Sequence, residues 1–340
     1  NVVEFMLNEM GYTRDNLQKH YGKNKDSLSI IDPSCGSGTF LYNATNRLVE
    51  TFFDKSNKSA KLTEQLINEN IFGFDIAEFP LYLAEMNILM RMLPIIINER
   101  YNNPIEQKIK VFKTRDSIAE FLDTEIKNTI ADMATAFKKG KIQFDLFTQA
   151  IDLDHSSFMR DKGDLDDLKT SLEDKNKKPR IRFDFVVGNP PYVSYNECAK
   201  QKLLIIQLIQ GGKINMGDIY GMNLNSIPSK LKTYPPKPNL YAFFIALGIG
   251  LLKNDGIISY IIPQTILTAN DLDVLRYHLS NFLTIEKIIT FSGNMFIGRG
   301  IKQNRPVPTS SLIFIIRKTP PTKLHQVEIV NYIQKEDVPF

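Results

Sequence analysis

FDFVVGNPPY, at residues 183–192, is the stretch that decides the fold. Its first half is rich in aromatic and β-branched residues, and a glycine and two prolines follow, which is typical of a buried strand that ends abruptly. Open α/β sheets bind their ligands beyond the carboxyl ends of their strands. We therefore expect the NPPY loop at residues 189–192 to lie at a ligand site on the edge of an α/β sheet.

The NPPY loop carries groups that suit a planar amine. Asn189 has a side-chain carbonyl, and Pro190 has a main-chain carbonyl but no N–H. Each precedes a proline and is therefore held extended, so the two acceptors can point at one position. Tyr192 adds a ring face on which a base can stack, a contact worth about 1–3 kcal/mol per base. Asn-Pro and Pro-Pro also mark ordinary turns, so the loop alone leaves a structural role open.

Length and composition set broad limits. The 340 residues allow one large α/β domain or two small ones, and 43% hydrophobic residues are enough for a sizeable core. The net charge of +4 fits an anionic partner without requiring one. Two cysteines, Cys35 and Cys198, give no disulfide framework and no metal-ligand spacing, so we predict no metal site and a cytoplasmic location. The longest apolar run, at 240–252, is too short to span a bilayer, and we predict no membrane contact.

A second motif, DPSCGSGTF at residues 32–40, stands between an apolar strand and a helix expected from about Thr39. Gly36 and Gly38 allow a ligand to approach the backbone closely, and the helix start presents free N–H groups. A structural turn is the alternative, but Asp32 in front and the helix behind favour a nucleotide-type cofactor loop. The Gly-Lys-Ser/Thr of a phosphate-binding loop is absent, which argues against ATP.

Two further acids end predicted strands. Asp75 closes the strand in IFGFDIAEF, where it can accept both ribose hydroxyls of an adenosine. Asp116 ends the strand in KIKVFKTRDSI, where it can accept a hydrogen bond from an adenine amine. Each acid alone is more often a helix N-cap. With Asp32, however, three acids at the ends of three successive strands would converge on one edge of a parallel sheet.

Two long insertions interrupt this pattern, at about 118–180 and 196–238. The first begins with helical periodicity and ends in the charge run DKNKKPRIR, for which we expect a solvated surface, with phosphate contact as the alternative. The second is rich in glycine and proline and is long for a structureless connection, which favours either a functional loop or an ordinary surface loop.

The order of DPSCGSGTF, FGFDIAEF, RDSI, NPPY, LYAFF...LLKNDG and PTSSLIFIIRK resembles the N6-adenine-specific DNA methyltransferases. Within them the chain is similar to the methyltransferase domains of large bacterial restriction-modification enzymes, type IIG or type I-like. The resemblance covers nearly the whole chain. It implies a Rossmann-like class I S-adenosylmethionine-dependent methyltransferase fold, α/β, with a mostly parallel seven-stranded sheet and an antiparallel terminal hairpin.

The resemblance also implies a reaction. S-adenosylmethionine would give its methyl group to the N6 amine of a flipped-out adenine in double-stranded DNA, within a restriction-modification or phage-defence system. It implies the catalytic residues Asn189, Pro190 and Tyr192, with Tyr192 and Phe296 sandwiching the target base. The implied cofactor-binding residues are Asp32, Ser34, Cys35, Gly36, Gly38, Asp75, Ile76, Asp116 and Phe244.

The expected domain organisation follows from the same resemblance. Residues 1–318 would form the methyltransferase domain, and 319–340 a linker or the start of a missing target-recognition domain. The Thr-Pro pair that the family places before VVEFM is absent from the chain. Part of the cofactor lid is therefore expected to be missing. Because no target-recognition region is evident after the last strand, a specificity or endonuclease domain or subunit is an expected partner.

Two other functions stay open. Related NPPY methyltransferases act on a guanine amine in ribosomal RNA or on a protein glutamine. They differ from this chain in being compact and in having no large first insertion. A non-catalytic DNA-binding or assembly module of a defence complex would keep the fold without turnover.

Overall fold

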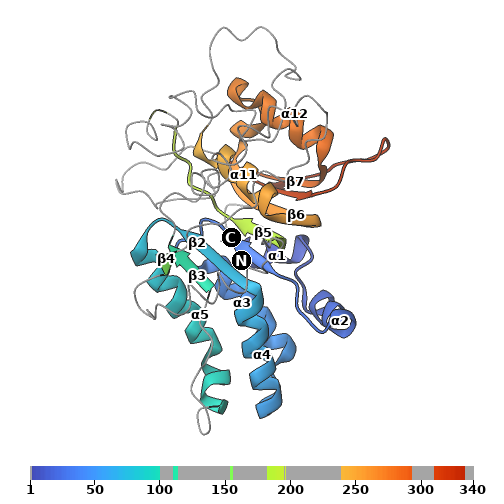
Figure 1. Ribbon diagram of the computed structural model, residues 1–340. Coiled ribbons are helices and arrows are strands. Elements are labelled where there is room, and N and C mark those ends of the chain that lie inside the picture. Colours follow the sequence, from blue (N-terminus) through green and yellow to red (C-terminus); the bar gives the residue numbers. More distant parts are fainter. Residues whose placement is uncertain are drawn as a thin grey trace, which may run out of the picture.

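The computed structural model describes residues 2–99, 110–113, 154–155, 182–194, 196, 239–292 and 310–333. Its centre is one sheet with the strand order β4-β3-β2-β1-β5-β6-β8-β7-β9 (Figure 1). The strands are β1 (Ile30–Asp32), β2 (Ile71–Asp75), β3 (Lys110–Lys113), β4 (Asp154–His155), β5 (Phe183–Gly188), β6 (Leu252–Pro263), β7 (Thr284–Ser292), β8 (Ser311–Arg317) and β9 (Glu328–Ile333).

The topology confirms the predicted fold class. Strands β3, β2, β1, β5 and β6 are parallel neighbours, and β8 pairs antiparallel with both β6 and β7. The β7–β8 pair is the predicted terminal hairpin, with β8 inserted between β6 and β7. The sheet adds two strands to the expected seven: β4, antiparallel to β3, and β9, parallel to β7. Because β9 lies within residues 319–340, that segment contributes to the sheet; the domain boundary at residue 318 stays a prediction.

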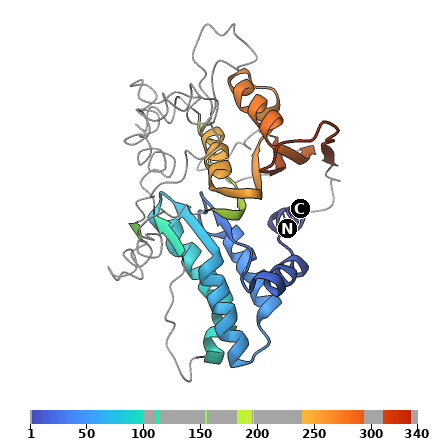
Figure 2. The ribbon, with the colours of Figure 1, turned by 45° about the vertical axis from the view of Figure 1, so that its right-hand side comes forward.

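Helices cover both faces of the sheet, as Figures 1 and 2 show. The neighbouring residues Ile30 and Ile31 point into different apolar clusters, as do Val186 and Val187, which is the period-two alternation of strands buried on both sides. One face carries α1 (Val2–Glu9), α2 (Arg14–Asn24), α3 (Thr39–Phe52), α4 (Asn57–Asn70) and α5 (Glu78–Glu99). The other carries α11 (Leu240–Leu251), η4 (Gln264–Leu267), η5 (Asn270–Leu272) and α12 (Asp273–Phe282).

Two helices are unusually apolar. All twelve residues of α11 are buried, as expected of a helix that is hydrophobic all round. In the part of the chain that the structure describes, Phe79–Ile97 of α5 is long and apolar enough to cross a membrane, judged by length and composition alone. One side of α5 packs against α3 and α4, so it also serves as a core helix of the sheet domain. The apolar run noted at 240–252 contains α11, whereas α5 was not predicted from the sequence.

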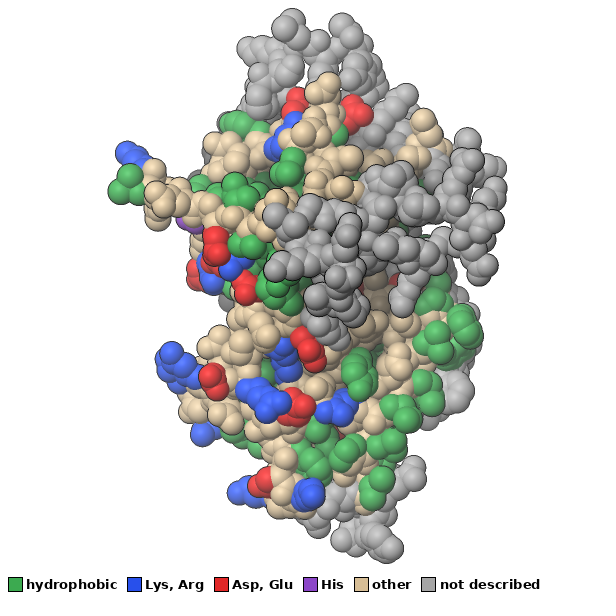
Figure 3. Space-filling view, turned by 180° about the vertical axis from the view of Figure 1, so that it is seen from behind, with side chains coloured by type: hydrophobic (Ala, Val, Ile, Leu, Met, Phe, Trp, Pro, Cys, Tyr) green, Lys and Arg blue, Asp and Glu red, His purple; other side chains and the backbone are tan. Residues whose placement is uncertain are grey.

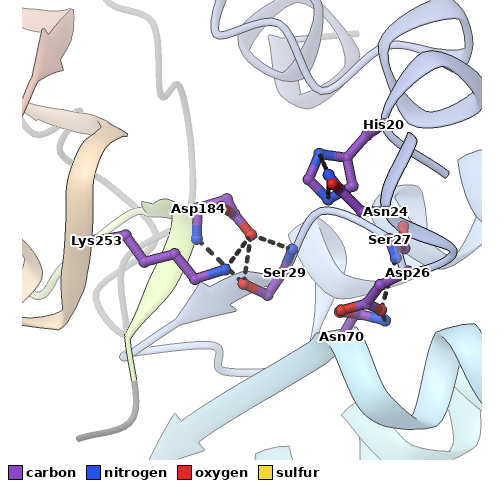
Figure 4. Close-up of polar contacts among 8 residues, drawn as sticks. All are labelled: His20, Asn24, Asp26, Ser27, Ser29, Asn70, Asp184 and Lys253. Atoms are coloured by element: carbon purple, nitrogen blue, oxygen red, sulfur yellow. Dashed lines mark hydrogen bonds and ion pairs between the residues drawn. The ribbon is translucent and has the colours of Figure 1, made fainter. Parts of the chain in front are cut away.

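A hydrogen-bond cluster joins the starts of β1 and β5 at the amino edge of the sheet (Figure 4). Asp184 Oδ2 accepts hydrogen bonds from Ser29 N at 2.9 Å, Ser29 Oγ at 2.8 Å and Lys253 Nζ at 2.8 Å. Ser29 Oγ also accepts from Asp184 N at 3.1 Å. Burial raises the pKa of Asp184, but the bonds from Lys253 and Ser29 together outweigh it and hold the pKa below its usual value. The cluster fixes the two central strands relative to each other.

Replacing Asp184 by alanine should lower the free energy of unfolding by about 1–3 kcal/mol at pH 7, because the Ser29 donors lose their acceptor. Urea unfolding measures this. The control is Lys253→Ala, which removes a half-exposed ion-pair partner and should cost less than about 1 kcal/mol.

The loss of stability in Asp184→Ala should also depend on pH. Since the folded-state pKa is depressed, the contribution of Asp184 is present above the unfolded-state pKa and is lost as pH falls through the folded-state pKa. The difference in the free energy of unfolding between the wild type and Asp184→Ala should therefore shrink below about pH 4. Equal losses in the two variants, or a deficit that does not change with pH, would contradict this role.

Candidate active site

Asp32 ends β1 as a buried carboxyl group. Its side chain is 1% exposed, and Oδ1 accepts a hydrogen bond from Ser34 N at 3.0 Å. Burial raises the pKa of Asp32 to about 8; the Ser34 N–H partly opposes this shift, and the negative charge of Asp75 adds to it. Asp32 is therefore largely protonated near neutral pH in the free protein, and a cation beside it would favour the ionised form.

The loop between β1 and α3 is fixed to the neighbouring strand β2. Cys35 N donates to Phe74 O at 2.9 Å, and Gly38 N donates to Cys35 O at 2.8 Å. Gly36 has φ +51° and nothing within 4 Å of the position that a Cβ would take, so open space lies beside it. Gly38 has φ +77°, and its Cβ would lie 2.7 Å from Ala84 Cβ. Gly36 is therefore the glycine with room for a ligand, whereas Gly38 is needed where α3 meets α5.

Asp75, at the end of β2, completes the candidate cofactor site formed with Asp32 and the loop 34–38, which is called the cofactor edge below. Its Oδ2 accepts from Gly36 N at 2.9 Å and its Oδ1 from Ala77 N at 2.8 Å, so its carboxylate is held against the loop. The next side chain, Ile76, is 54% exposed and offers an apolar surface beside these carboxylates. Cys35 is buried, and burial raises the pKa of its thiol, which keeps it a small uncharged side chain.

The NPPY loop leaves β5 on the same edge and is anchored from two sides. Asn189 is exposed and Pro190 is buried. The Tyr192 hydroxyl donates to Ile261 O at 2.9 Å, and its ring meets Tyr241 edge-on, with centroids 6.3 Å apart. Leu240 N donates to Val193 O at 2.9 Å, which closes the loop onto the start of α11. The ring of Tyr192 is therefore held in one orientation.

Tyr241 is in turn held in place. Its ring is buried, and its hydroxyl lies 3.1 Å from Thr265 Oγ1 in η4, the segment that follows β6. The contacts that hold Tyr192 through Tyr241 and Thr265 were not predicted, because these residues are about 50 and 70 positions further along the chain. The apolar stretch LYAFF predicted burial of Tyr241 but not its contact.

Gly188 brings the two halves of the site together. A Cβ on this residue would lie 2.7 Å from Asp32 Oδ1 and 3.5 Å from Tyr260 Cε1. The backbone that leads into the NPPY loop thus lies against the buried carboxyl group of the cofactor edge. A glycine inside a strand often marks such a close approach, and this signal was present in FDFVVG but was not used.

The structure places most of the predicted residues on this edge. Asp32, Ser34, Gly36 and Asp75 are joined by hydrogen bonds, and the strand before Asn189 touches Asp32. Phe244 is buried within α11, and its contact with a cofactor stays a prediction. Asp116 and Phe296 lie outside the described residues. Among the residues that the structure describes, no group of three or more His, Cys, Asp or Glu side chains could hold a metal ion.

Known proteins resemble this chain in sequence. The Type II methyltransferase M.TthHB8I of Thermus thermophilus is 28% identical over 124 residues, which cover 36% of this chain and 25% of that protein. The adenine-specific methyltransferase BrxX of Escherichia coli O9:H4 is 24% identical over 293 residues, which cover 74% of this chain and 22% of that protein. The chain thus spans about a quarter of the length of these two relatives.

Solved structures share the fold. The structure of a nuclease-deletion mutant of the Type ISP restriction-modification enzyme LlaGI, in complex with a DNA substrate mimic, matches with a TM-score of 0.55 at 17% identity. That match covers 95% of this chain and 23% of the other. The DrdV–DNA complex matches with a TM-score of 0.52 at 14% identity, covering 98% of this chain and 27% of the other.

A family match decides the assignment. The family described as Eco57I restriction-modification methylase matches residues 69–296, more than half of the chain. The matched region includes Asp75 at the cofactor edge, the whole of β5 and the NPPY loop. The chain therefore belongs to the Eco57I restriction-modification methylase family.

Proposed function

We propose that this chain transfers the methyl group of S-adenosylmethionine to the N6 amine of a flipped-out adenine in DNA. The observation that carries the proposal is the contact of Gly188 with Asp32, because it unites a cofactor edge and an exposed Asn-Pro-Pro-Tyr loop in one site. The family assignment and the names of the relatives, both adenine-specific or Type II methyltransferases, support the same reaction.

The residues at the cofactor edge fit S-adenosylmethionine. The bound cofactor would supply a methyl group on a positively charged sulfur, next to a cationic amine. Asp32, with its buried carboxyl group, and the open space beside Gly36 suit the charged methionine part. The carboxylate of Asp75 suits the ribose hydroxyls, and the exposed side chain of Ile76 suits a flat adenine.

The NPPY loop would carry the transfer step. A base inside a duplex cannot present its amine to the donor, so the adenine must leave the stack at a cost of a few kcal/mol. The ring of Tyr192 offsets that cost by stacking, and Phe296 is the proposed second ring. The oxygens of Asn189 and Pro190 accept the two amine hydrogens, which frees the nitrogen lone pair to form the new N–C bond.

No strong base is required for this step. The bound cofactor would supply the methyl group, and its sulfur would keep the electron pair of the broken carbon–sulfur bond as the new N–C bond forms. The nitrogen becomes cationic, and the two acceptor oxygens stabilise that charge because they are already oriented. The nitrogen then releases one proton to solvent and returns to neutrality. Positioning by the anchored loop supplies much of the remaining rate enhancement.

The biological setting is part of the proposal. We infer a role in a restriction-modification or related phage-defence system, with double-stranded DNA as substrate and a specificity or endonuclease domain or subunit as partner. A cytoplasmic location accords with such a role. The DrdV structure is a complex with DNA and the LlaGI structure a complex with a DNA substrate mimic, which supports DNA as the partner.

The first test uses the full-length protein with labelled S-adenosylmethionine and Asn189→Ala beside it. The variant should lose transfer by at least about a hundredfold, because one oriented acceptor is gone, while its affinity for the cofactor changes less than about threefold. Asn281→Ala, an exposed substitution on α12, is the matched control and should transfer at the wild-type rate.

The same assay separates the competing functions. Unmethylated DNA, ribosomal RNA and a release factor are offered side by side. Label in DNA as N6-methyladenine supports the proposal. Label only in RNA or protein would contradict it, and bound cofactor without transfer to any substrate would identify a non-catalytic module.

The second test concerns the charge of Asp32. Because its folded-state pKa is raised, Asp32 favours the folded state at low pH, and this contribution is lost as pH rises through about 8. Without ligand, Asp32→Asn should therefore be more stable than the wild type at pH 8.5, and its advantage should narrow toward pH 5. Thermal unfolding across this range measures the difference.

The stabilised variant should also bind the cofactor at least about tenfold more weakly, since a neutral amide loses the attraction for a cationic ligand. Titration calorimetry at pH 8 measures this loss. An advantage in stability that does not change with pH, or unchanged cofactor affinity, would contradict the role given to Asp32.

A further inference from the structure

The ring of Tyr192 is supported at two points by the chain at and after the end of β6. Its hydroxyl donates to Ile261 O in β6, and the ring meets Tyr241 edge-on. The hydroxyl of Tyr241 lies 3.1 Å from Thr265 Oγ1 in η4, which begins directly after β6. The orientation of the Tyr192 ring therefore depends on how residues 264–269, called the η4 turn below, are held in place.

The start of the η4 turn is fixed to two strands. Gln264 N donates to Ser310 O at 2.8 Å. The side-chain Nε2 of Gln264 donates to Phe291 O in β7 at 3.3 Å and to Ser311 O in β8 at 3.2 Å. The first residue of the turn is therefore part of the sheet, and the residues that follow need an anchor of their own.

Arg276 of α12 provides that anchor. Its Nη1 donates to Ile266 O at 2.8 Å and to Ala269 O at 2.7 Å. Within the turn, Ala269 N donates to Thr265 O at 2.8 Å. One cationic group thus binds the carbonyl groups on either side of residues 267–268, and hydrogen bonds from a charged donor are among the stronger ones in proteins.

α12 is a fixed base for this anchor. Leu275 and Leu279 of the helix are buried in the same apolar cluster as Tyr241, and α11, β6 and α12 lie together in one half of the molecule (Figures 1 and 2). Burial raises the pKa of the Tyr241 phenol, while its contact with Thr265 and the positive charge of Arg276 oppose that rise. Arg276 therefore acts on Tyr241 through the turn and also directly through its charge.

We propose that Arg276 is a positioning residue for the target base. It holds the η4 turn, and the turn holds Tyr241, so that the ring of Tyr192 is ready to stack on the flipped adenine. This role rests on the proposed function, because Tyr192 must stack on the base. Stacking offsets the cost of taking the adenine out of the duplex. Loss of the anchor should therefore matter most at an adenine that is paired, where this cost is largest.

Single-turnover transfer by the full-length protein tests this role. Two duplexes carry the target site, which sequencing of methylated DNA identifies; in one the adenine is paired, and in the other it faces an abasic site. Arg276→Met keeps the length of the side chain but has no N–H groups. It should slow transfer to the paired adenine by at least about tenfold and to the unpaired adenine by less than about threefold. Its affinity for S-adenosylmethionine should stay within about threefold of the wild type.

Arg317→Met is the matched control. Arg317 is also half-buried and also donates to a main-chain carbonyl, that of Asp255, at 3.1 Å. It lies at the amino end of the sheet, however, where it is paired with Ile257 near the start of β6. This variant should transfer to both duplexes at the wild-type rate.

A second pair of variants tests the path through the turn. Thr265→Val keeps the shape of the side chain without the hydroxyl that contacts Tyr241, and it should show the same selective loss at the paired adenine. Thr265→Ser keeps the hydroxyl and should transfer like the wild type. Because Thr265 is exposed, both variants should fold even where Arg276→Met does not.

Hydrogen exchange reports on the turn without any substrate. In Arg276→Met the amides of Thr268 and Ala269, which form hydrogen bonds within the turn, should exchange at least about fivefold faster. The amide of Gln264 should keep its wild-type protection, because its acceptor lies outside the turn.

Three results would overturn the proposal. The first is wild-type transfer to the paired adenine by Arg276→Met or by Thr265→Val. The second is an equal loss on both duplexes, which would indicate a general loosening of the fold. The third is unchanged exchange at Thr268 and Ala269. If the wild type methylates neither duplex, the proposed function fails instead, and hydrogen exchange still decides whether Arg276 holds the turn.

Discussion

The close approach of Gly188 to Asp32 is the constraint on which the site depends. β5 lies beside β1 in the sheet, so the strand that leads into the NPPY loop passes the carboxyl group that ends β1. A side chain at Gly188 would occupy the space of that carboxyl group. Asp32 is also only 1% exposed, and this burial raises the pKa of its carboxyl group. Gly188 therefore lies between the proposed catalytic loop and the buried carboxyl group of Asp32.

Hydrogen bonds on both sides of this close approach fix β1, β5 and the NPPY loop relative to one another. The Ser29–Asp184 bonds fix β1 and β5 at their starts, and the Tyr192 hydroxyl fixes the loop that follows β5 to the backbone of β6. The buried carboxyl group of Asp32 costs stability at neutral pH, and the two buried cores on either side of the sheet offset that cost. Stability is thus given up for a buried carboxyl group whose ionised form a cationic ligand would favour.

The sequence predicted the parts of this architecture that depend on local pattern. Short apolar runs bounded by glycine and proline predicted β1, β2 and β5 and the loops that end them. The position of Asp32, Asp75 and Asn189 at the carboxyl ends of these strands predicted that they share an edge. The β7–β8 hairpin was also predicted. β4 is only two residues long, which is too short to give a strand pattern. β9 was not predicted, although its sequence EIVNYI is rich in β-branched residues.

Contacts between distant segments could not be predicted. The packing of Tyr192 on Tyr241 and of Gly188 on Asp32 depends on strand order, and hydrophobic periodicity does not encode strand order. The exposed apolar residues of α5, among them Phe79, Met90 and Ile97, were not predicted for a related reason (Figure 3): α5 is apolar on nearly all sides, so its pattern does not show which side the domain covers. For Asp116 and Phe296 the proposed roles still depend on the resemblance alone.

The most direct measurement of the central claim is single-turnover methyl transfer by Gly188→Ala, with circular dichroism to establish that the variant is folded. The added Cβ must displace Asp32 or the start of the NPPY loop, since the gap is only 2.7 Å. A shift of about 1 Å at this position should slow transfer on the order of a hundredfold and also weaken cofactor binding. A folded variant with wild-type rate and affinity would contradict the account.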